Sequence, residues 1–257
     1  MYFGICLLSI IPVRKEPAHT AEMVTQVLFG ELYKIISEAD DWLRIQLSDD
    51  GYEGWISAKQ AGMITEAEFL RLLNAETAIS ADLVQILSNQ TTKTILPILM
   101  GSSLPGLKQQ QFQINSDNFL YEGLTIEKQV PEVISTASNL KQFRLRLIDD
   151  AMLYLNAPYL WGGRSPFGID CSGFVQMVYK LKQIKLPRDA SQQAAQGEVV
   201  GLLGEAEPGD LAFFDDNEGT INHVGILIDQ NQLIHCSGKV RIDPIDHQGI
   251  YLSLIHI

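Results

Sequence analysis

The sequence predicts an α+β protein in which small all-β domains precede a domain built from a helix and an antiparallel sheet. Two features of the chain lead to this prediction. About the first 60 residues contain short, alternating apolar segments divided by turns, which is typical of strands. The last part of the chain contains helix-like apolar spacing followed by short strand-like runs. With 257 residues and 46% hydrophobic content, the chain can form two or three domains with their own cores.

Residues 1–61 are expected to form the first all-β domain. Strands are predicted over residues 4–13, 24–31, 32–36, 42–47 and 52–56. The segment Asp49-Asp50-Gly51 has the composition of a turn between the last two strands. The strand order and the Gly-Trp-Ile sequence at 54–56 resemble a bacterial SH3-like barrel. Such a barrel could shape a substrate site, bind a polymer or serve as scaffold.

The middle of the chain is expected to hold a helical connector and a second β domain. Residues 62–79 are assigned to the connector, because the apolar residues between Gly62 and Asn74 suit a helix. Residues 80–128 are interpreted as a second, degenerate SH3-like barrel with several short strands.

Residues 129–257 are expected to form the last domain. Helix is predicted over residues 131–137 and 140–155. The apolar residues expected to pack on the core of this domain are Ile148, Met152, Leu153 and Leu155. A further helix and several strands follow, which gives the helix-and-sheet arrangement of the predicted fold.

Cys171 lies at the predicted start of that further helix. The apolar residues that recur after it at helical spacing are Phe174, Val175, Val178 and Leu181. Asp170 is a good N-cap, because its carboxylate can accept from the first-turn amides. The start of a helix stabilises a thiolate, so we expect the pKa of Cys171 to lie below the value of about 8.5 for a free cysteine. The alternative is a buried structural cysteine, against which the polar, glycine-rich turn before Cys171 argues.

Two histidines lie on a predicted hairpin downstream of Cys171. His223 begins one apolar run, His235 lies in the next, and a turn at 229–231 joins the two. Side chains on adjacent antiparallel strands are neighbours, so the two imidazoles are expected to face each other. One could take the thiol proton while the other fixes its tautomer. A lone strand histidine is commonly structural, but two on one hairpin favour catalysis.

A zinc site formed by Cys171, His223, His235 and Cys236 is the competing chemistry. The chain has no paired Cys-x-x-Cys or His-x-x-x-His spacing of the kind that zinc sites use. On a strand, His235 and Cys236 would also point to opposite faces. We therefore expect no metal and no other cofactor.

The motifs around these residues, taken together, resemble those of the NlpC-type cell-wall peptidases, which are papain-like cysteine enzymes. The matching segments, in the family's order, are residues 159–163, 168–174, 186–188, 208–211, 223–226 and 234–235. They cover about the last 110 residues, the size of one small domain. The resemblance implies a papain-like fold with Cys171 as nucleophile, His223 as base and His235 as the residue that orients the base.

The whole architecture is similar to that of the γ-D-glutamyl-L-diamino acid endopeptidases of murein-peptide recycling. In that group the first barrel limits the substrate to peptides with a free N-terminal L-Ala. The residues expected to bind substrate are Tyr52, Glu22, Asp170, Ser172, Trp161, Arg188, Asp189 and Ser191. The resemblance covers the barrel segments that contain Glu22 and Tyr52, while Arg188, Asp189 and Ser191 follow the predicted helix and could line the pocket. A carboxylate is needed to pair the ammonium group of L-Ala, and Glu22, Glu16 and Asp170 are candidates. Tyr52 and Glu22 could instead be ordinary turn residues. The alternative for Arg188, Asp189 and Ser191 is that they only anchor their loop.

The composition limits the partners and the location. A net charge of −12 and a pI near 4.8 disfavour nucleic acid and an anionic polymer, and are compatible with a small peptide. The three cysteines have no disulfide spacing, which favours a reducing compartment. The N-terminal sequence suits a first strand better than a signal peptide. No segment is long enough to span a membrane. We expect a cytoplasmic monomer without nucleic-acid or membrane partners, or a periplasmic or secreted one if a leader has been removed.

Other functions stay open at this point. The chain could be a hydrolase of intact peptidoglycan that its SH3-like domains target to the wall. It could be an acyltransferase or amidase, because the same fold performs these reactions. It could be a non-catalytic peptide-binding module, against which the intact set of Cys171, His223 and His235 argues. The sequence does not distinguish meso-diaminopimelate from Lys as the diamino acid.

Overall fold

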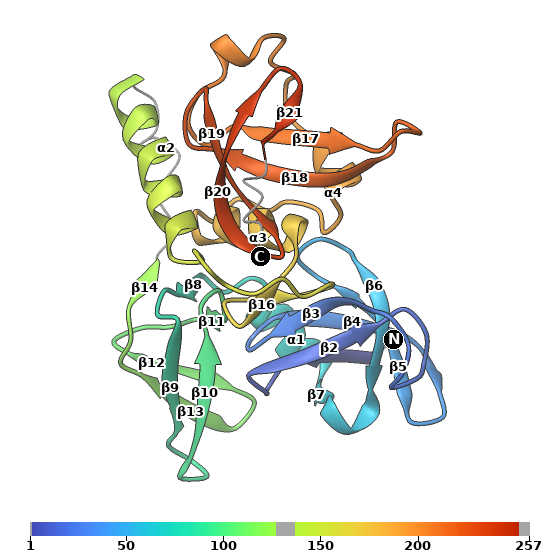
Figure 1. The fold of residues 1–257 in the computed structure, drawn as a ribbon. Helices are drawn as coiled ribbons and strands as arrows, with labels where there is room; N and C mark the ends of the chain where they lie inside the picture. The colour runs from blue at the N-terminus through green and yellow to red at the C-terminus, as the bar shows by residue number, and fades with distance from the viewer. Residues whose placement is uncertain (1, 127–136, 252–257) are drawn as a thin grey trace. The chain divides into compact units, whose positions relative to one another are not determined.

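The structure is a computed structural model that describes residues 2–126 and 137–251 (Figure 1). The chain divides into two compact units. Unit 1 comprises residues 1–128 and the segment Trp161–Pro166, and unit 2 comprises residues 129–160 and 167–257. The domain boundaries expected from the sequence stay predictions, but the assignment of Trp161–Pro166 to unit 1 was not foreseen. No helix within the described ranges is long and apolar enough to cross a membrane.

Unit 1 begins with an antiparallel sheet that has the strand order β3-β2-β6-β5-β4-β1-β7. Its strands are β1 (Tyr2–Ile5), β2 (Ile10–Arg14), β3 (Met23–Leu28), β4 (Leu32–Ala39), β5 (Trp42–Leu47), β6 (Glu53–Ser57) and β7 (Gly62–Ile64), with the 3-10 helix η1 (Ala58–Gln60) after β6. In β5 the buried residues are Leu43, Ile45 and Leu47, which is the period of two expected for a strand with one face on a core. The predicted strand 4–13 is divided between β1 and β2.

The predicted helical connector is only partly helical. Residues 62–64 form strand β7, which pairs with β1. The helix α1 (Glu66–Leu73) begins after Thr65, whose hydroxyl accepts from the backbone N–H of Glu68 at 3.2 Å. This N-cap satisfies one of the free amides of the first turn, which fixes the start of the helix.

Two further sheets complete unit 1, with the strand orders β10-β9-β13-β12 and β11-β8-β14. Their strands are β8 (Thr77–Ser80), β9 (Val84–Asn89), β10 (Thr94–Leu99), β11 (Ser103–Pro105), β12 (Gln111–Ile114), β13 (Asp117–Tyr121) and β14 (Thr125–Ile126). Phe29, which follows β3, lies edge-on to Phe112 and Phe119, with ring centroids 6.3 and 5.9 Å away. The two β regions of unit 1 therefore share a hydrophobic core.

Unit 2 consists of helices and an antiparallel sheet with the strand order β17-β18-β19-β20-β21. Its elements are α2 (Ala137–Met152), β16 (Gly168–Ile169), α3 (Cys171–Leu181), α4 (Ala190–Ala194), the 3-10 helix η3 (Leu203–Glu205), β17 (Leu211–Asp215), β18 (Ile221–Leu227), β19 (Gln232–Ser237), β20 (Lys239–Asp246) and β21 (Gly249–Ile250). Helix α3 packs on β18 and β19. This is the α+β arrangement that the sequence predicts.

The predicted core face of helix α2 is confirmed only in part, because Ile148 is buried and Met152 is half-buried but the other two predicted residues are not. Its buried residues are Leu147, Ile148 and Ala151. Leu153 and Leu155 lie beyond the end of the helix and are 51% and 42% exposed, so their predicted place in the core was wrong. The predicted helical residues 131–136 lie outside the described residues.

Candidate active site

The predicted nucleophile Cys171 is the first residue of α3, as expected. The carboxylate of Asp170 accepts from the backbone N–H of Gly173 at 2.7 Å, which caps the helix. The thiol of Cys171 donates to the backbone carbonyl of Asn222, with Sγ and the oxygen 3.9 Å apart. The backbone N–H of Val224 also lies at the sulfur. Cys171 is thus placed against the strand backbone on both sides of His223.

The pKa of Cys171 does not follow the prediction. Burial raises the pKa of the thiol above its ordinary value, and the negative charge of Asp170 raises it further. The amides of Val224 and Ser172 lower the pKa without outweighing these two effects. The expected low pKa was wrong because the stabilising end of the helix is buried and carries a carboxylate cap. In the resting structure Cys171 is a thiol.

The two histidines of the predicted hairpin are in contact. His223 lies on β18 and His235 on β19, and Nε2 of His223 is 2.7 Å from Nδ1 of His235. Burial lowers the pKa of His223 to about 4, and the neighbouring His235 contributes to the shift. His223 is therefore neutral at pH 7. Its other ring nitrogen, Nδ1, is the one left to accept a proton from Cys171.

Asp243 on β20 also belongs to this cluster, although no motif in the sequence singled it out. Its Oδ2 lies 2.9 Å from Nε2 of His235, and both side chains are almost completely buried. Arg241 donates from Nη2 to Oδ1 of Asp243 at 2.7 Å. Burial would raise the pKa of Asp243, but the hydrogen bonds from Arg241 and His235 lower it below its ordinary value. Strand β20 also contains Lys239, Arg241 and Asp246, so its sequence alone does not distinguish Asp243.

Three of the predicted substrate residues form a buried cluster behind the start of α3. The guanidinium of Arg188 binds both carboxylate oxygens of Asp170 and donates to the hydroxyl of Ser172 at 2.9 Å. Arg188 is 2% exposed. This geometry favours the anchoring alternative for Arg188 over a place in an open pocket. It also holds Asp170 in position to cap the helix that carries Cys171.

The other two predicted residues of this loop lie around α4. Asp189 is the N-cap of α4 and forms a capping box with Gln192. Ser191 is exposed on the first turn of the same helix. The capping box explains Asp189 as an anchor for the loop. A substrate contact by either residue stays a prediction.

The predicted substrate residues of the first barrel lie in unit 1. Nε1 of Trp161 donates to Glu22 at 2.8 Å, and Lys15 donates to the same carboxylate at 3.2 Å. Both hydrogen bonds lower the pKa of Glu22, that from Trp161 most. Tyr52 is half-buried and packs against the core of the first barrel. Glu22 and Trp161 therefore contact each other, and Tyr52 packs against the core of the barrel. A role in binding substrate stays a prediction for all three residues.

The segment Trp161–Pro166 is held in unit 1 by Arg164, another residue that the sequence did not single out. The guanidinium of Arg164 makes two hydrogen bonds of 2.9 Å to Glu31, and both side chains are buried. It also donates to the backbone carbonyl of Gln26 at 2.7 Å. Gly162 has a φ of +75°, and a Cβ there would lie 2.4 Å from the carbonyl oxygen of Met23. Only glycine fits this close approach.

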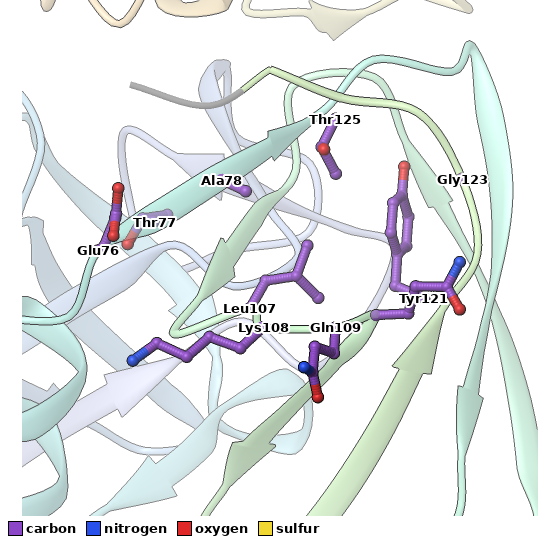
Figure 2. Close-up of a pocket in the computed structure, with 10 residues that line it drawn as sticks. Glu76, Thr77, Ala78, Leu107, Lys108, Gln109, Tyr121, Gly123 and Thr125 are labelled. Carbon is purple, nitrogen blue, oxygen red and sulfur yellow. The ribbon is translucent and has the colours of Figure 1, made fainter. Parts of the chain in front are cut away.

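A cavity of about 760 Å³ lies elsewhere in unit 1 (Figure 2). It is lined by residues near β8, by the loop at 107–110 and by the stretch from Tyr121 to Thr125. None of the predicted site residues lines it. Within residues 2–126 and 137–251, no group of His, Cys, Asp and Glu side chains is arranged to hold a metal ion.

Comparisons with known proteins match this organisation. The model of the NlpC/P60 family matches residues 156–257, and that of the bacterial dipeptidyl-peptidase SH3 domain matches residues 13–60. The γ-D-glutamyl-L-lysine dipeptidyl-peptidase of Bacillus subtilis (strain 168) is 30% identical over 235 residues, which cover 82% of this chain and 71% of that protein. The chain belongs to the NlpC/P60 family. A protein of the same name from Bacillus cereus (strain ATCC 10987 / NRS 248) is 27% identical over 256 residues, covering 89% and 72%.

A solved structure supports the fold of this NlpC/P60 chain. The crystal structure of an NlpC/P60 family protein from Bacillus cereus ATCC 10987 has a TM-score of 0.77 and 21% identity, over 97% of this chain and 96% of that one. The predicted resemblance and the α+β fold with an N-terminal SH3 domain are confirmed. The roles of the individual site residues stay predictions.

The cluster in the NlpC/P60 domain can perform nucleophilic chemistry. A thiol lies at the start of a helix, where backbone amides can stabilise a developing oxyanion. A neutral imidazole on the adjacent strand can serve as base, and a second imidazole holds it. These groups come from α3, β18 and β19, which pack on one another within unit 2.

Proposed function

We propose that this chain is a cysteine peptidase that hydrolyses the bond between γ-D-Glu and an L-diamino acid in murein-derived peptides. The observation that carries the proposal is the Cys171 thiol, which lies against the backbone on both sides of His223. The names of the two Bacillus relatives, γ-D-glutamyl-L-lysine dipeptidyl-peptidases, support this class of bond.

The reaction begins with the Cys171 thiol and the His223 imidazole, both in their neutral forms. Sγ of Cys171 attacks the γ-carbonyl carbon of D-Glu while Nδ1 of His223 takes the thiol proton. Backbone amides at the start of α3, including that of Cys171, stabilise the oxyanion of the tetrahedral intermediate. His223 gives its proton to the amine of the diamino acid as the C–N bond breaks, which leaves a thioester on Cys171. Water then attacks the thioester with His223 as base, releasing the dipeptide and restoring the thiol.

The names of the same relatives also support a proposal for the substrate. A dipeptidyl-peptidase releases two residues from a free N-terminus, so the names of the relatives favour one residue before γ-D-Glu. We infer that this residue is L-Ala, which the family resemblance implies. Its ammonium needs a carboxylate partner. The candidates from the sequence are Glu22, Glu16 and Asp170, and the carboxylate of Asp170 is already bound by Arg188. The protein would then trim small peptides instead of cutting the intact wall.

Digestion of defined peptides tests this function. The panel contains L-Ala-γ-D-Glu-L-Lys, its meso-diaminopimelate analogue, the N-acetylated form of each and the α-linked isomer of the first. We expect release of L-Ala-D-Glu from the free γ-linked peptides, identified by mass. A hydrogen bond to a charged group contributes about 1.5–3 kcal/mol, so acetylation should lower kcat/KM by roughly ten- to a hundredfold or more.

Two results would contradict the proposal. Equal cleavage of the α-linked isomer would show that the γ-D-glutamyl bond is not recognised. Clearing of intact sacculi, together with equal cleavage of free and acetylated peptides, would identify a hydrolase of the wall.

A further inference from the structure

A line of hydrogen bonds leads away from His223 and ends at a carboxylate. Nε2 of His223 contacts Nδ1 of His235, and Nε2 of His235 contacts Oδ2 of Asp243, at 2.7 and 2.9 Å. Arg241 contacts both carboxylate oxygens of Asp243. His235 and Asp243 are each 1% exposed, so water does not compete for these contacts.

The chemistry of these groups sets the direction of each hydrogen bond. A carboxylate only accepts hydrogen bonds, so Nε2 of His235 must carry the proton. Burial lowers the pKa of His235, so this ring is neutral at pH 7. A neutral imidazole has one N–H, so Nδ1 of His235 is an acceptor. It must accept from Nε2 of His223, which therefore carries the proton of that ring. Nδ1 of His223 is left with its lone pair, the state that a base for Cys171 requires.

We propose that Asp243 is a positioning residue that fixes the tautomers of both His235 and His223, so that Nδ1 of His223 can accept the thiol proton. This rests on the proposed function only in assigning His223 the role of base. Asp243 does not reach the reacting atoms. It acts through two imidazoles in series.

The strand register explains how this line is built. His235 is paired with Gly225 on β18 and with Arg241 on β20. His223 lies two residues before Gly225 on β18, and Asp243 lies two residues after Arg241 on β20, so all of these side chains share one face of the sheet. A Cβ at Gly225 would lie 2.9 Å from Cβ of His235. The missing side chain at Gly225 leaves room for His235 to reach across to His223.

Arg241 makes the carboxylate necessary. Arg241 has only donors and cannot lose its proton in a protein. If Asp243 were replaced by Ala, the group beside His235 would be a donor, because Arg241 is its direct partner on β20. Nε2 of His235 would then become the acceptor. Both rings would then change tautomer. Nδ1 of His223 would carry a proton and could not act as base.

The kinetic test compares Asp243→Ala with the double variant Asp243→Ala/Arg241→Leu, using L-Ala-γ-D-Glu-L-Lys. A wrong tautomer at a triad histidine costs about 10⁴ in kcat. We expect Asp243→Ala to lower kcat by up to this factor, with KM little changed. The double variant should regain part of the lost kcat, because Arg241, the donor that changes the tautomers of both rings, is gone. Asp243→Asn should lie between wild type and Asp243→Ala, because its amide can present either an oxygen or an N–H.

A merely structural role predicts the opposite order, since the double variant removes more packing and should be worse than Asp243→Ala. Wild-type kcat in Asp243→Ala, or a double variant less active than Asp243→Ala, would overturn the proposal.

Histidine-selective ¹⁵N NMR gives a second readout that needs no substrate. In the wild-type protein at pH 7, we expect both His223 and His235 to carry the proton on Nε2, and in Asp243→Ala to carry it on Nδ1. A wild-type His223 with its proton on Nδ1, or unchanged tautomers in Asp243→Ala, would overturn the proposal. If Asp243→Ala does not fold, the wild-type spectrum still decides. Because no peptide is present, this result is independent of whether the proposed substrate is correct.

Discussion

Both partners of the proposed proton transfer are held in their neutral forms. Burial and Asp170 raise the pKa of the Cys171 thiol, while burial and His235 lower the pKa of His223 to about 4. Each shift disfavours a thiolate–imidazolium pair at rest. The thiol proton must therefore move to His223 as the sulfur attacks, and His223 must be unprotonated for turnover.

The pH profile should show this neutral base. Because His223 is active when unprotonated and its pKa is about 4, kcat/KM should stay level as the pH falls from 7 to about 5 and decline near 4. An ordinary histidine would give the decline near 6.5. The measurement is kcat/KM against pH, with circular dichroism at each pH and a return to pH 7 as controls for folding.

A loss of kcat/KM between pH 7 and 6 in the folded protein would contradict this account of His223.

The lowered pKa of His223 also affects the stability of the fold. The lowered folded pKa means that His223 contributes stability above the unfolded pKa of about 6.5, and that this contribution is lost as the pH falls towards 4.

At the scale of elements, the segment Trp161–Pro166 departs most from what its sequence suggested. It was expected to belong to the last domain, yet Arg164 ties it to Glu31 of unit 1. Removing one partner of a buried ion pair typically costs about 3–5 kcal/mol, because the other charge is left uncompensated. An exposed pair is worth only about 0–1 kcal/mol.

We therefore expect Glu31→Ala to lower the free energy of unfolding of unit 1 by about 3–5 kcal/mol. The matched control is Glu53→Ala, which removes the exposed pair with Arg44 in the same barrel and should cost no more than about 1 kcal/mol. The chain's tryptophans, Trp42, Trp55 and Trp161, all lie in unit 1, so their fluorescence during urea denaturation reports on this unit. Equal losses in the two variants would show that the Arg164–Glu31 pair does not anchor the segment.

Local patterns predicted the elements that carry the chemistry. The Asp170 N-cap and the helical spacing after Cys171 located α3, and two apolar runs around a short turn located the hairpin of His223 and His235. These features depend on residues close together in the chain. Asp243 and Arg164 could not be found in this way, because the fold brings their buried partners to them. His235 lies on the neighbouring strand β19, and Glu31 lies 133 residues away in the chain.

At the scale of the whole molecule, composition and fold limit the substrate. A net charge of −12 disfavours binding to an anionic wall polymer through long-range attraction. The first barrel and the later β region share a core, so unit 1 is a folded body rather than a flexible tether. Both observations are compatible with an enzyme for small peptides. Its cytoplasmic location and monomeric state stay predictions.

The proposed mechanism requires that Cys171 form a thioester with the γ-carboxyl group of D-Glu. The most direct measurement is mass spectrometry of the Cys171-containing fragment after acid quenching of wild type during turnover of L-Ala-γ-D-Glu-L-Lys. Wild type should carry the L-Ala-γ-D-glutamyl group on Cys171. Cys171→Ala should carry none and lose about 10⁶ in kcat, as expected when a triad loses its nucleophile, while Cys6→Ala in unit 1 keeps its turnover. Dipeptide release with Cys171 unmodified at every quench time, and wild-type turnover by Cys171→Ala, would contradict the account.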